Sequence, residues 1–231
     1  NGQIRSDYNP ATFIERPGKE TVRDRVYSDE EICNLWDVFG GMGTTGNIFK
    51  LCLITGQRLS EVSGLEWAEI GSANYRSDPN KPTTISVSFW TIPGNRTKNS
   101  LIHGVPFSPL ATQLIEGLER TSDLFCFESP VKKDRPYASL STARRAVKRK
   151  SGIEDFWPHD LRRTAFTRME SLGIDRFICD RITNHTETGV AKHYGHYSYT
   201  KEKAEALDAW AVHLQAILAE NVVSIGSMKK A

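Results

Sequence analysis

The chain has 231 residues, of which 39% are hydrophobic and 25% are charged, proportions typical of a globular protein with its own core. Its longest apolar run, residues 48–54, contains Lys50 and is far shorter than the roughly 20 apolar residues that span a bilayer, which excludes a membrane-spanning helix. The net charge is only +2, yet residues 131–168 carry eleven basic and four acidic side chains. This basic cluster predicts a surface that binds a polyanion, with a solvated helix face as the alternative.

The cysteines and the start of the chain indicate its compartment. Cys33, Cys52, Cys126 and Cys179 form no CxxC pair and have no histidine at the spacing of a zinc site, so we expect buried, reduced thiols. The opening has no signal-peptide pattern, which favours a cytoplasmic location. Residues 1–24 are polar and lack an initiator Met, and we interpret them as the remnant of a linker from a longer protein.

The first third of the chain predicts three helices. Ser28 and Glu31 form a capping-box pattern ahead of apolar residues at helical spacing, which end at Gly40. Residues 45–55 are largely apolar and predict a second, mostly buried helix. Helical spacing then resumes over 58–65, which places Arg58 at the start of a short helix.

A hairpin and a further helix follow. Residues 83–92 alternate between apolar and small polar side chains and predict a strand, and 101–107 predict its partner. The connection between them contains Arg96, Lys98 and Asn99. Ser108 and the proline after it are typical of an N-cap and the first residue of a helix.

The rest of the chain has helical patterns. Helices are expected over 139–150, which is rich in Arg and Lys, and over 159–172, 175–182 and 201–218. Residues 221–231 are expected to form a flexible tail. The sequence therefore predicts a mainly α fold with a small antiparallel β-sheet (α+β).

Six side chains that can act on a phosphate group occur in a defined order. They are Arg58 in TGQRLSE, Lys98 in RTKN, His159 and Arg162 in HDLRRT, and His185 followed nine residues later by Tyr194 in NHTETGVAKHY. Glu61, one turn after Arg58, can hold that guanidinium in a fixed orientation. Each motif alone fits an ordinary capped helix or loop, and it is their order that points to chemistry on a phosphodiester.

This order resembles the tyrosine recombinases, the phage-integrase family of DNA strand-transfer enzymes, over residues 25–220. The stretch HYSYTKEKAEALDAW looks more like prophage or genomic-island integrases of the satellite-phage type than like chromosome-dimer resolvases. The resemblance implies the fold of their catalytic domain and a bacterial enzyme that integrates or excises a mobile element. The sequence departs from the family at Asn184, where Gly is frequent, and at Phe107, where Leu is usual.

The resemblance also assigns roles. Arg58 and Arg162 would clamp the phosphate, because planar, permanently charged guanidinium groups suit the charge that develops on its oxygens. Tyr194 would be the nucleophile, and His159 would take its proton. Lys98 would protonate the leaving 5′ oxygen, and His185 would hydrogen-bond the phosphate. Because the two arginines would stabilise that charge, no metal is expected, and because a 3′-phosphotyrosyl bond conserves the energy of the original ester, no cofactor is expected.

Several alternatives remain open at this stage. Tyr197 or Tyr199 could replace Tyr194 as the nucleophile, although the nine-residue spacing favours Tyr194, and Arg96 could replace Lys98. The histidines without a catalytic role are interpreted as surface or phosphate-backbone residues (His103, His193 and His196) or as an edge-of-core residue (His213).

The expected partner is double-stranded DNA carrying attachment sites. The predicted DNA contacts outside the catalytic set are Arg96, Arg144, Arg145, Lys148, Arg149 and Arg163, and some of them are expected to be independent of sequence. The resemblance implies a homotetramer on DNA for the full-length protein, with a monomer possible for this fragment, and weak DNA binding without the amino-terminal domain. The rival functions are a type IB topoisomerase or resolvase, with the same chemistry, and a non-catalytic DNA-binding accessory protein.

Overall fold

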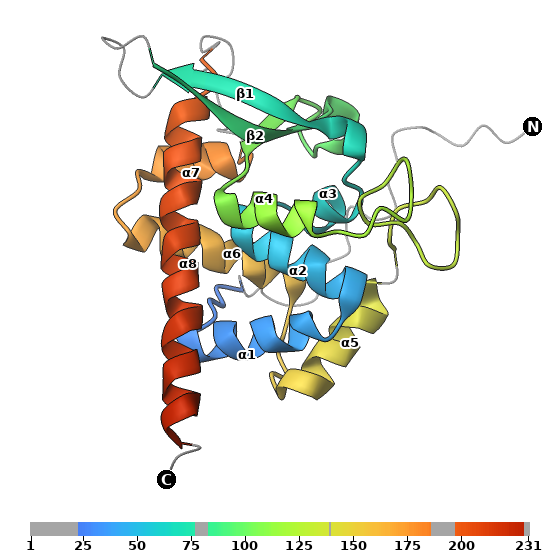
Figure 1. The fold of residues 1–231 in the computed structure, drawn as a ribbon, viewed down its shortest axis with the longest axis vertical. Helices are drawn as coiled ribbons and strands as arrows, with labels where there is room; N and C mark the ends of the chain where they lie inside the picture. The colour runs from blue at the N-terminus through green and yellow to red at the C-terminus, as the bar shows by residue number, and fades with distance from the viewer. Residues whose placement is uncertain (1–22, 77–82, 139, 186–196, 229–231) are drawn as a thin grey trace, which may run out of the picture.

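The computed structural model describes residues 23–76, 83–138, 140–185 and 197–228, which form a helical body with a small sheet at one end (Figure 1). The helices are α1 (Asp29–Gly40), α2 (Gly43–Thr55), α3 (Leu59–Ser63), α4 (Pro109–Glu116), α5 (Leu140–Ser151), α6 (Pro158–Ser171), α7 (Arg176–Ile182) and α8 (Thr200–Met228). The strands are β1 (Ile70–Arg76), β2 (Thr84–Ile92) and β3 (His103–Pro106). The predicted fold class, mainly α with a small antiparallel sheet, is confirmed.

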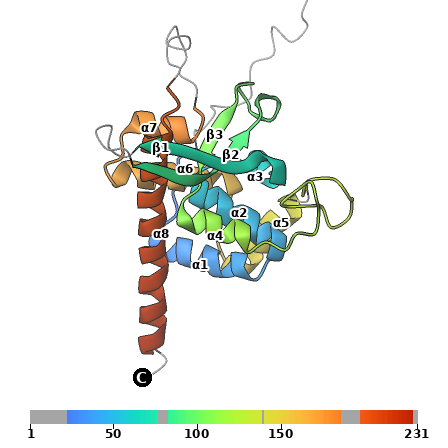
Figure 2. The ribbon, with the colours of Figure 1, turned by 45° about the horizontal axis from the view of Figure 1, so that its top comes forward.

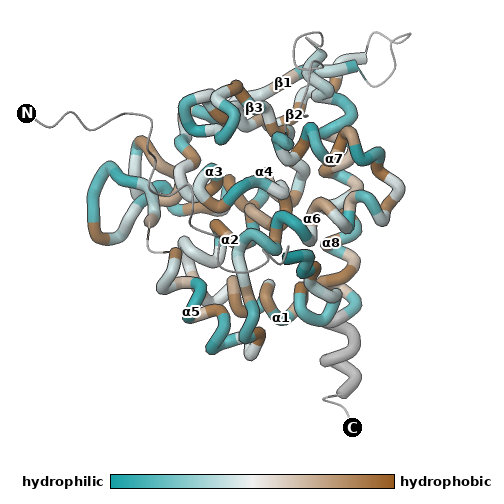
Figure 3. The backbone as a smooth tube through the Cα atoms, turned by 180° about the vertical axis from the view of Figure 1, so that it is seen from behind, coloured by the Kyte–Doolittle hydropathy of each residue, from teal (hydrophilic) through white to brown (hydrophobic). Residues whose placement is uncertain are grey.

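The helix α2 is the centre of the core, as its apolar composition predicts. Ile48, Phe49, Leu51 and Leu53 are fully buried, because α1, α3, α4, α6 and α8 all pack against this helix. Hydrophobic residues are frequent along α2 in Figure 3, whereas hydrophilic residues predominate on α5. The free thiols of all four cysteines are also buried, which agrees with their predicted state.

The sheet is antiparallel, in the order β1–β2–β3. Trp90 in β2 pairs with Ile70 on one side and with Val105 on the other, and its side chain is fully buried. The hairpin of β2 and β3 was predicted, although Leu101 and Ile102 are exposed and lie outside β3. The strand β1 was not predicted. Its sequence IGSANYR lacks a clear alternation, because the strand lies at the sheet edge and all seven of its residues are partly or fully exposed.

The helix α8 packs along one side of the body and continues past it toward the C-terminus (Figures 1 and 2). Its apolar face is buried, with Leu207, Trp210 and Leu214 at most 1% exposed, and the Trp210 indole nitrogen donates to the Leu53 carbonyl oxygen at 3.0 Å. The helix extends beyond the predicted end at residue 218 to Met228, so much of the segment expected to be a tail is helical.

Candidate active site

Arg58 is held in place at the start of α3. The chain turns at Gly56, which has a left-handed backbone (φ 67°), and Arg58 becomes the N-cap of the helix. Its Nη1 donates to Oε1 of the buried Glu61 at 2.9 Å, and Glu61 Oε2 accepts from the Arg58 backbone nitrogen at 3.1 Å. Glu61 therefore orients this guanidinium, as the one-turn spacing predicts.

Arg162, on α6, lies close to Arg58 and is almost completely buried, with 3% of its surface exposed. Its Nη1 donates to the Gly56 carbonyl oxygen at 2.9 Å and its Nη2 donates to the Thr183 carbonyl oxygen. Burial and the positive charge of Arg58 lower its pKa to about 10, so it stays protonated at neutral pH. No carboxylate among the described residues forms an ion pair with it. A buried cation without an anionic partner is costly, and an incoming phosphate would supply the missing charge.

His159 is exposed on the first turn of α6. Partial burial of its ring, together with the charges of Arg162 and Arg163, lowers its pKa below the usual value. The imidazole is therefore neutral at pH 7 and can accept a proton, as a general base must.

His185 follows α7 and is oriented by a carboxylate. Its Nδ1 lies 3.1 Å from Asp180 Oδ1, and because a carboxylate only accepts, this nitrogen carries the proton in the neutral ring. Partial burial and the charge of Arg162 lower the pKa of His185, and the Asp180 contact only partly offsets this effect. The ring is thus neutral with Nε2 as its acceptor, and it lies 5.6 Å from the Phe166 ring.

Three consecutive backbone carbonyl oxygens at the end of α7 accept hydrogen bonds from side chains of this site. The Ile182 oxygen accepts from Gln57 Nε2 at 2.8 Å and from His103 Nε2 at 2.9 Å. The Thr183 oxygen accepts from Arg162, and the Asn184 oxygen accepts from Arg58 Nη2 at 3.2 Å. The last carbonyl groups of a helix lack partners within it, so these bonds fasten the chain that leads to His185 directly to the two arginines.

The hairpin connection reaches the same place. Asn99 Nδ2 donates to Asn184 Oδ1 at 2.8 Å, which ties the loop between β2 and β3 to the end of α7. Lys98 is the neighbour of Asn99, is exposed, and forms no hydrogen bond or ion pair with any described residue. Five of the six predicted catalytic residues thus lie on segments that are joined by hydrogen bonds or adjacent in sequence.

The sixth, Tyr194, lies in residues 186–196, outside the described residues. The two alternative tyrosines have other contacts. Tyr197 donates to Glu202 Oε1 at 3.0 Å, and this bond raises the pKa of the phenol, which disfavours the phenolate that attacks a phosphate. The Tyr199 ring packs against Phe177, with 5.1 Å between the ring centroids.

The predicted DNA-contacting residues differ in exposure, and some of them have partners within the protein. Arg96 points inward, where it forms an ion pair with Glu69 and donates to the Glu61 carbonyl oxygen, so its geometry gives no support to a DNA contact. Arg163 forms an ion pair with the buried Asp160. On α5, Arg145 and Arg149 are exposed, Lys148 donates to the Glu154 carbonyl oxygen, and Arg144 contacts residues 156 and 157.

Sequence reasoning missed the supporting residues. His103 was expected at the surface, and this prediction is wrong: its side chain is 6% exposed, and burial lowers its pKa to about 3. The signal was available, because His103 shares a face of its strand with the apolar Val105. Gln57 and Asn184 carry no comparable signal, since their partners lie far away in the sequence.

The described residues contain no group of three or more His, Cys, Asp or Glu side chains that could hold a metal ion. Within the same part of the chain, every helix is too short or too polar to cross a bilayer.

The chain is similar to known proteins over most of its length. The model of the phage integrase family matches residues 42–201, more than half of the chain. Tyrosine recombinase XerC of Staphylococcus carnosus (strain TM300) is 25% identical over 216 residues, which cover 87% of this chain and 67% of that protein.

Two solved structures share the fold. The integrase from mycobacterium phage Brujita matches with a TM-score of 0.57 and 16% identity, over 87% of this chain and 63% of its own. The XerH site-specific recombinase bound to its difH substrate matches with a TM-score of 0.51 and 13% identity, over 70% of this chain and 47% of its own. The chain therefore spans between about half and two thirds of the length of these proteins.

Proposed function

Because the chain belongs to the phage integrase family, we propose that it is the catalytic domain of a site-specific DNA recombinase that integrates or excises a mobile element. The domain comprises residues 25–220. Its substrate is double-stranded DNA, and this is supported by the likeness to the XerH site-specific recombinase, whose structure was solved bound to its difH substrate. The full-length enzyme acts as a tetramer on two duplexes in the bacterial cytoplasm.

The reaction is a transesterification. The Tyr194 phenol oxygen attacks the scissile phosphorus as His159 removes its proton, and the bond from phosphorus to the 5′ oxygen breaks. Lys98 gives the departing 5′ oxygen a proton, and a 3′-phosphotyrosyl bond remains. A 5′-hydroxyl of another strand then attacks this bond, releases Tyr194 and reseals the DNA.

The observation that supports this proposal most strongly is that the two guanidinium groups of Arg58 and Arg162 lie close together and are both held in place. Glu61 offsets the charge of Arg58, whereas Arg162 is buried without a carboxylate partner in the described part of the chain. Two fixed guanidinium groups stabilise the negative charge that builds on the non-bridging oxygens in the transition state, without reorganising during the reaction. A protein that only binds DNA gains nothing from a buried, unpaired arginine beside two neutral histidines.

The test is covalent trapping on nicked DNA. A library of nicked duplexes with randomised sequence is incubated with the protein, and the nick lets the short 5′-hydroxyl fragment diffuse away, so that the adduct accumulates. We expect a covalent protein–DNA adduct on a denaturing gel with the wild type and none with Tyr194→Phe. An adduct that persists in Tyr194→Phe contradicts the assignment of the nucleophile, and no adduct with either protein favours the accessory-protein function.

The sequences of the trapped duplexes also distinguish a site-specific recombinase from a type IB topoisomerase. A type IB topoisomerase relaxes supercoiled plasmid without any selected site, whereas we expect relaxation here to require a sequence recovered from the trapped adducts. Efficient relaxation of plasmids that lack this sequence would contradict site-specific recombination.

A further inference from the structure

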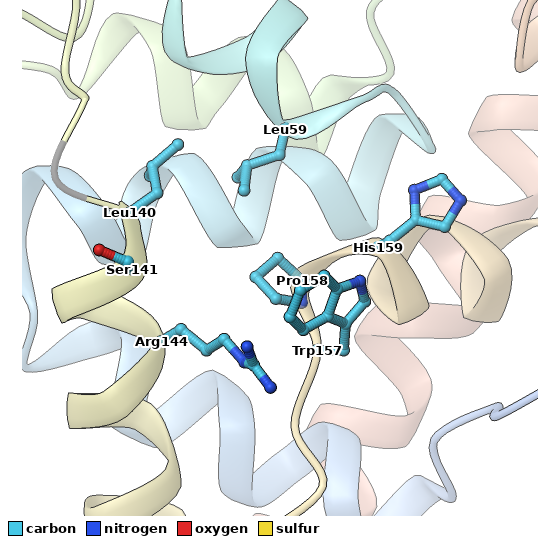
Figure 4. A pocket seen from close by; sticks show the side chains of 7 residues that line it. All are labelled: Leu59, Leu140, Ser141, Arg144, Trp157, Pro158 and His159. Atoms are coloured by element: carbon cyan, nitrogen blue, oxygen red, sulfur yellow. The ribbon is translucent and has the colours of Figure 1, made fainter. Parts of the chain in front are cut away.

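A cavity of about 350 Å³ opens beside the candidate active site (Figure 4). Most of its wall is carbon, from Leu59, Leu140, Trp157 and Pro158, and the polar groups include Arg144 and His159. Leu59 directly follows Arg58 in sequence, and His159 is itself the proposed base. The cavity thus shares His159 with the proposed catalytic set, but its apolar wall has no role in the reaction described above.

Arg144 crosses from α5 toward Trp157 and is fixed there by two contacts (Figure 4). Its Nε donates to the Phe156 carbonyl oxygen at 3.1 Å, and its guanidinium carbon lies 3.9 Å from the centroid of the Trp157 ring. Stacking and the Nε bond hold the plane of the group still. Both terminal nitrogens, Nη1 and Nη2, form no hydrogen bond or ion pair with any described residue, so they are a prearranged pair of donors.

Trp157 is kept at the surface by its backbone. Two hydrogen bonds to Tyr27 fix the backbone of Trp157. Its nitrogen donates to the Tyr27 hydroxyl at 3.0 Å, and its carbonyl oxygen accepts from that hydroxyl at 3.1 Å. The side chain is 42% exposed, and its indole nitrogen donates to no described residue. The indole is therefore accessible at the surface beside Arg144.

The occupant of this cavity must combine an apolar face with anionic oxygens. No carboxylate belongs to the cavity wall, which disfavours a cationic ligand, while Arg145 and Arg149 extend the positive surface along α5. A nucleotide of duplex DNA has both properties, in its deoxyribose and its phosphate.

We propose that this cavity receives the deoxyribose of a nucleotide next to the scissile phosphate, and that the terminal nitrogens of Arg144 bind the neighbouring phosphate bidentately. The inference rests on the proposed function, because it takes the scissile phosphate to lie at Arg58 and Arg162. It gives Arg144 and Trp157 a task that differs from general attraction to DNA: they set the position of the strand relative to the nucleophile.

The first experiment compares equilibrium binding of a trapped duplex sequence, or of a random 20-base-pair duplex if none is trapped, by fluorescence anisotropy. Arg144→Gln and Arg145→Gln each remove one positive charge from adjacent positions of α5, but only Arg144 lines the cavity. We expect Arg144→Gln to weaken binding about tenfold and Arg145→Gln about twofold, because a bidentate contact is stronger than a screened surface charge. Equal losses would overturn the proposal.

A second variant tests the apolar wall without changing any charge. Leu140→Trp fills the cavity, whereas Leu140→Ala leaves it open, and thermal melting verifies that both proteins fold. We expect Leu140→Trp to weaken binding about as much as Arg144→Gln, and Leu140→Ala to bind within about twofold of the wild type. Wild-type binding by Leu140→Trp would contradict occupation of the cavity.

The third experiment locates the phosphate. Each phosphate within three nucleotides of the cleavage point of a trapped duplex, where the binding register is fixed, is replaced in turn by a neutral methylphosphonate. We expect one position to weaken binding by the wild type about tenfold and to have no further effect in Arg144→Gln, since coupled losses identify contacting groups. If the loss of binding from the methylphosphonate adds to the loss from Arg144→Gln at every position, the contact between Arg144 and a phosphate is contradicted. The adduct assay tests the recombinase function, whereas these binding ratios test the cavity, so failure of one can be told from failure of the other.

Discussion

At the scale of single residues, the site depends on buried polar groups whose partners come from distant parts of the chain. The sequence could predict Arg58 with Glu61, because they lie one turn apart. It could not predict that the carbonyl oxygens of Ile182, Thr183 and Asn184 accept hydrogen bonds from side chains of the site. The bond to Thr183 joins residues 21 apart, and the bonds to Ile182 and Asn184 join residues 125 and 126 apart. Order and spacing thus suffice to propose a catalytic set, whereas the residues that support it could not be predicted from the sequence.

Arg162 should tolerate no replacement, including lysine. Arg162→Lys keeps the charge but loses the planar pair of donors, and Arg162→Ala loses both. We expect the rate of adduct formation to fall about 10²-fold to 10³-fold for Arg162→Ala, the usual loss when one prearranged donor to a transition state is removed. Single-turnover cleavage of the nicked duplex measures this rate, and a loss below about threefold in either variant, at unchanged melting temperature, would contradict its role.

His103 predicts a specific dependence of stability on pH. Its pKa is about 3 in the folded protein, against about 6.5 in the unfolded chain, so the unfolded state takes up the proton first as the pH falls. The contribution of His103 is therefore complete above pH 6.5 and is lost progressively toward pH 3, by up to about 1.4 kcal/mol per unit.

The variant His103→Gln separates this titration from the hydrogen bond. Glutamine can still donate to the Ile182 carbonyl oxygen but does not titrate. Denaturant melts at pH 4, 5, 6 and 8 should show a smaller acid loss for His103→Gln than for the wild type. Identical slopes would indicate that His103 is not buried in its neutral form.

At the scale of elements, local patterns predicted the helices well because caps and apolar spacing agree in them. Ser28 and Glu31 form the predicted capping box at the start of α1, and Ser108 caps α4. The strand β1 could not be predicted, because its pairing with β2 and not its own composition makes it a strand. The helix α8 was predicted to end at residue 218, but it continues to Met228.

The crossing of α1 and α2 depends on a glycine. A Cβ atom at Gly46 would lie 1.8 Å from the Phe39 carbonyl oxygen, which is rigid backbone. We expect Gly46→Ala to lower the free energy of unfolding by about 1–3 kcal/mol or more, because the two helices must separate. In the control, Gly40→Ala, the nearest atom is the flexible Lys50 Nζ at 3.8 Å, and denaturant melts should show no loss. Equal stability of the two variants would contradict this packing.

At the scale of the whole molecule, positive charge is concentrated on α5 and the start of α6, next to the candidate site. The sheet and α8 are joined to each other and to the end of α7. Lys203 in α8 donates to the Gly104 carbonyl oxygen at 2.6 Å, and the adjacent His103 binds the end of α7. The long helix is thereby linked to the active site through β3. Sequence counts located the basic surface, but only the fold shows that it adjoins Arg58 and Arg162.

This distribution predicts a steep salt dependence of DNA binding. Each phosphate that is neutralised contributes about −0.9 to the slope of log affinity against log salt concentration. With several arginines and lysines of α5 available, we expect a slope steeper than about −2, and a flatter slope for Arg145→Gln combined with Arg149→Gln. Anisotropy titrations between about 50 and 200 mM salt measure it. A flat dependence would mean that α5 only faces solvent.

The central claim is that Tyr194 forms a covalent bond with DNA, and mapping the adduct tests it most directly. The trapped adduct is digested with trypsin and nuclease, and the peptide that carries a nucleotide is fragmented in a mass spectrometer. We predict that the added mass lies on Tyr194 within residues 193–201. Nucleotide on Tyr197, Tyr199 or any other residue would contradict the account.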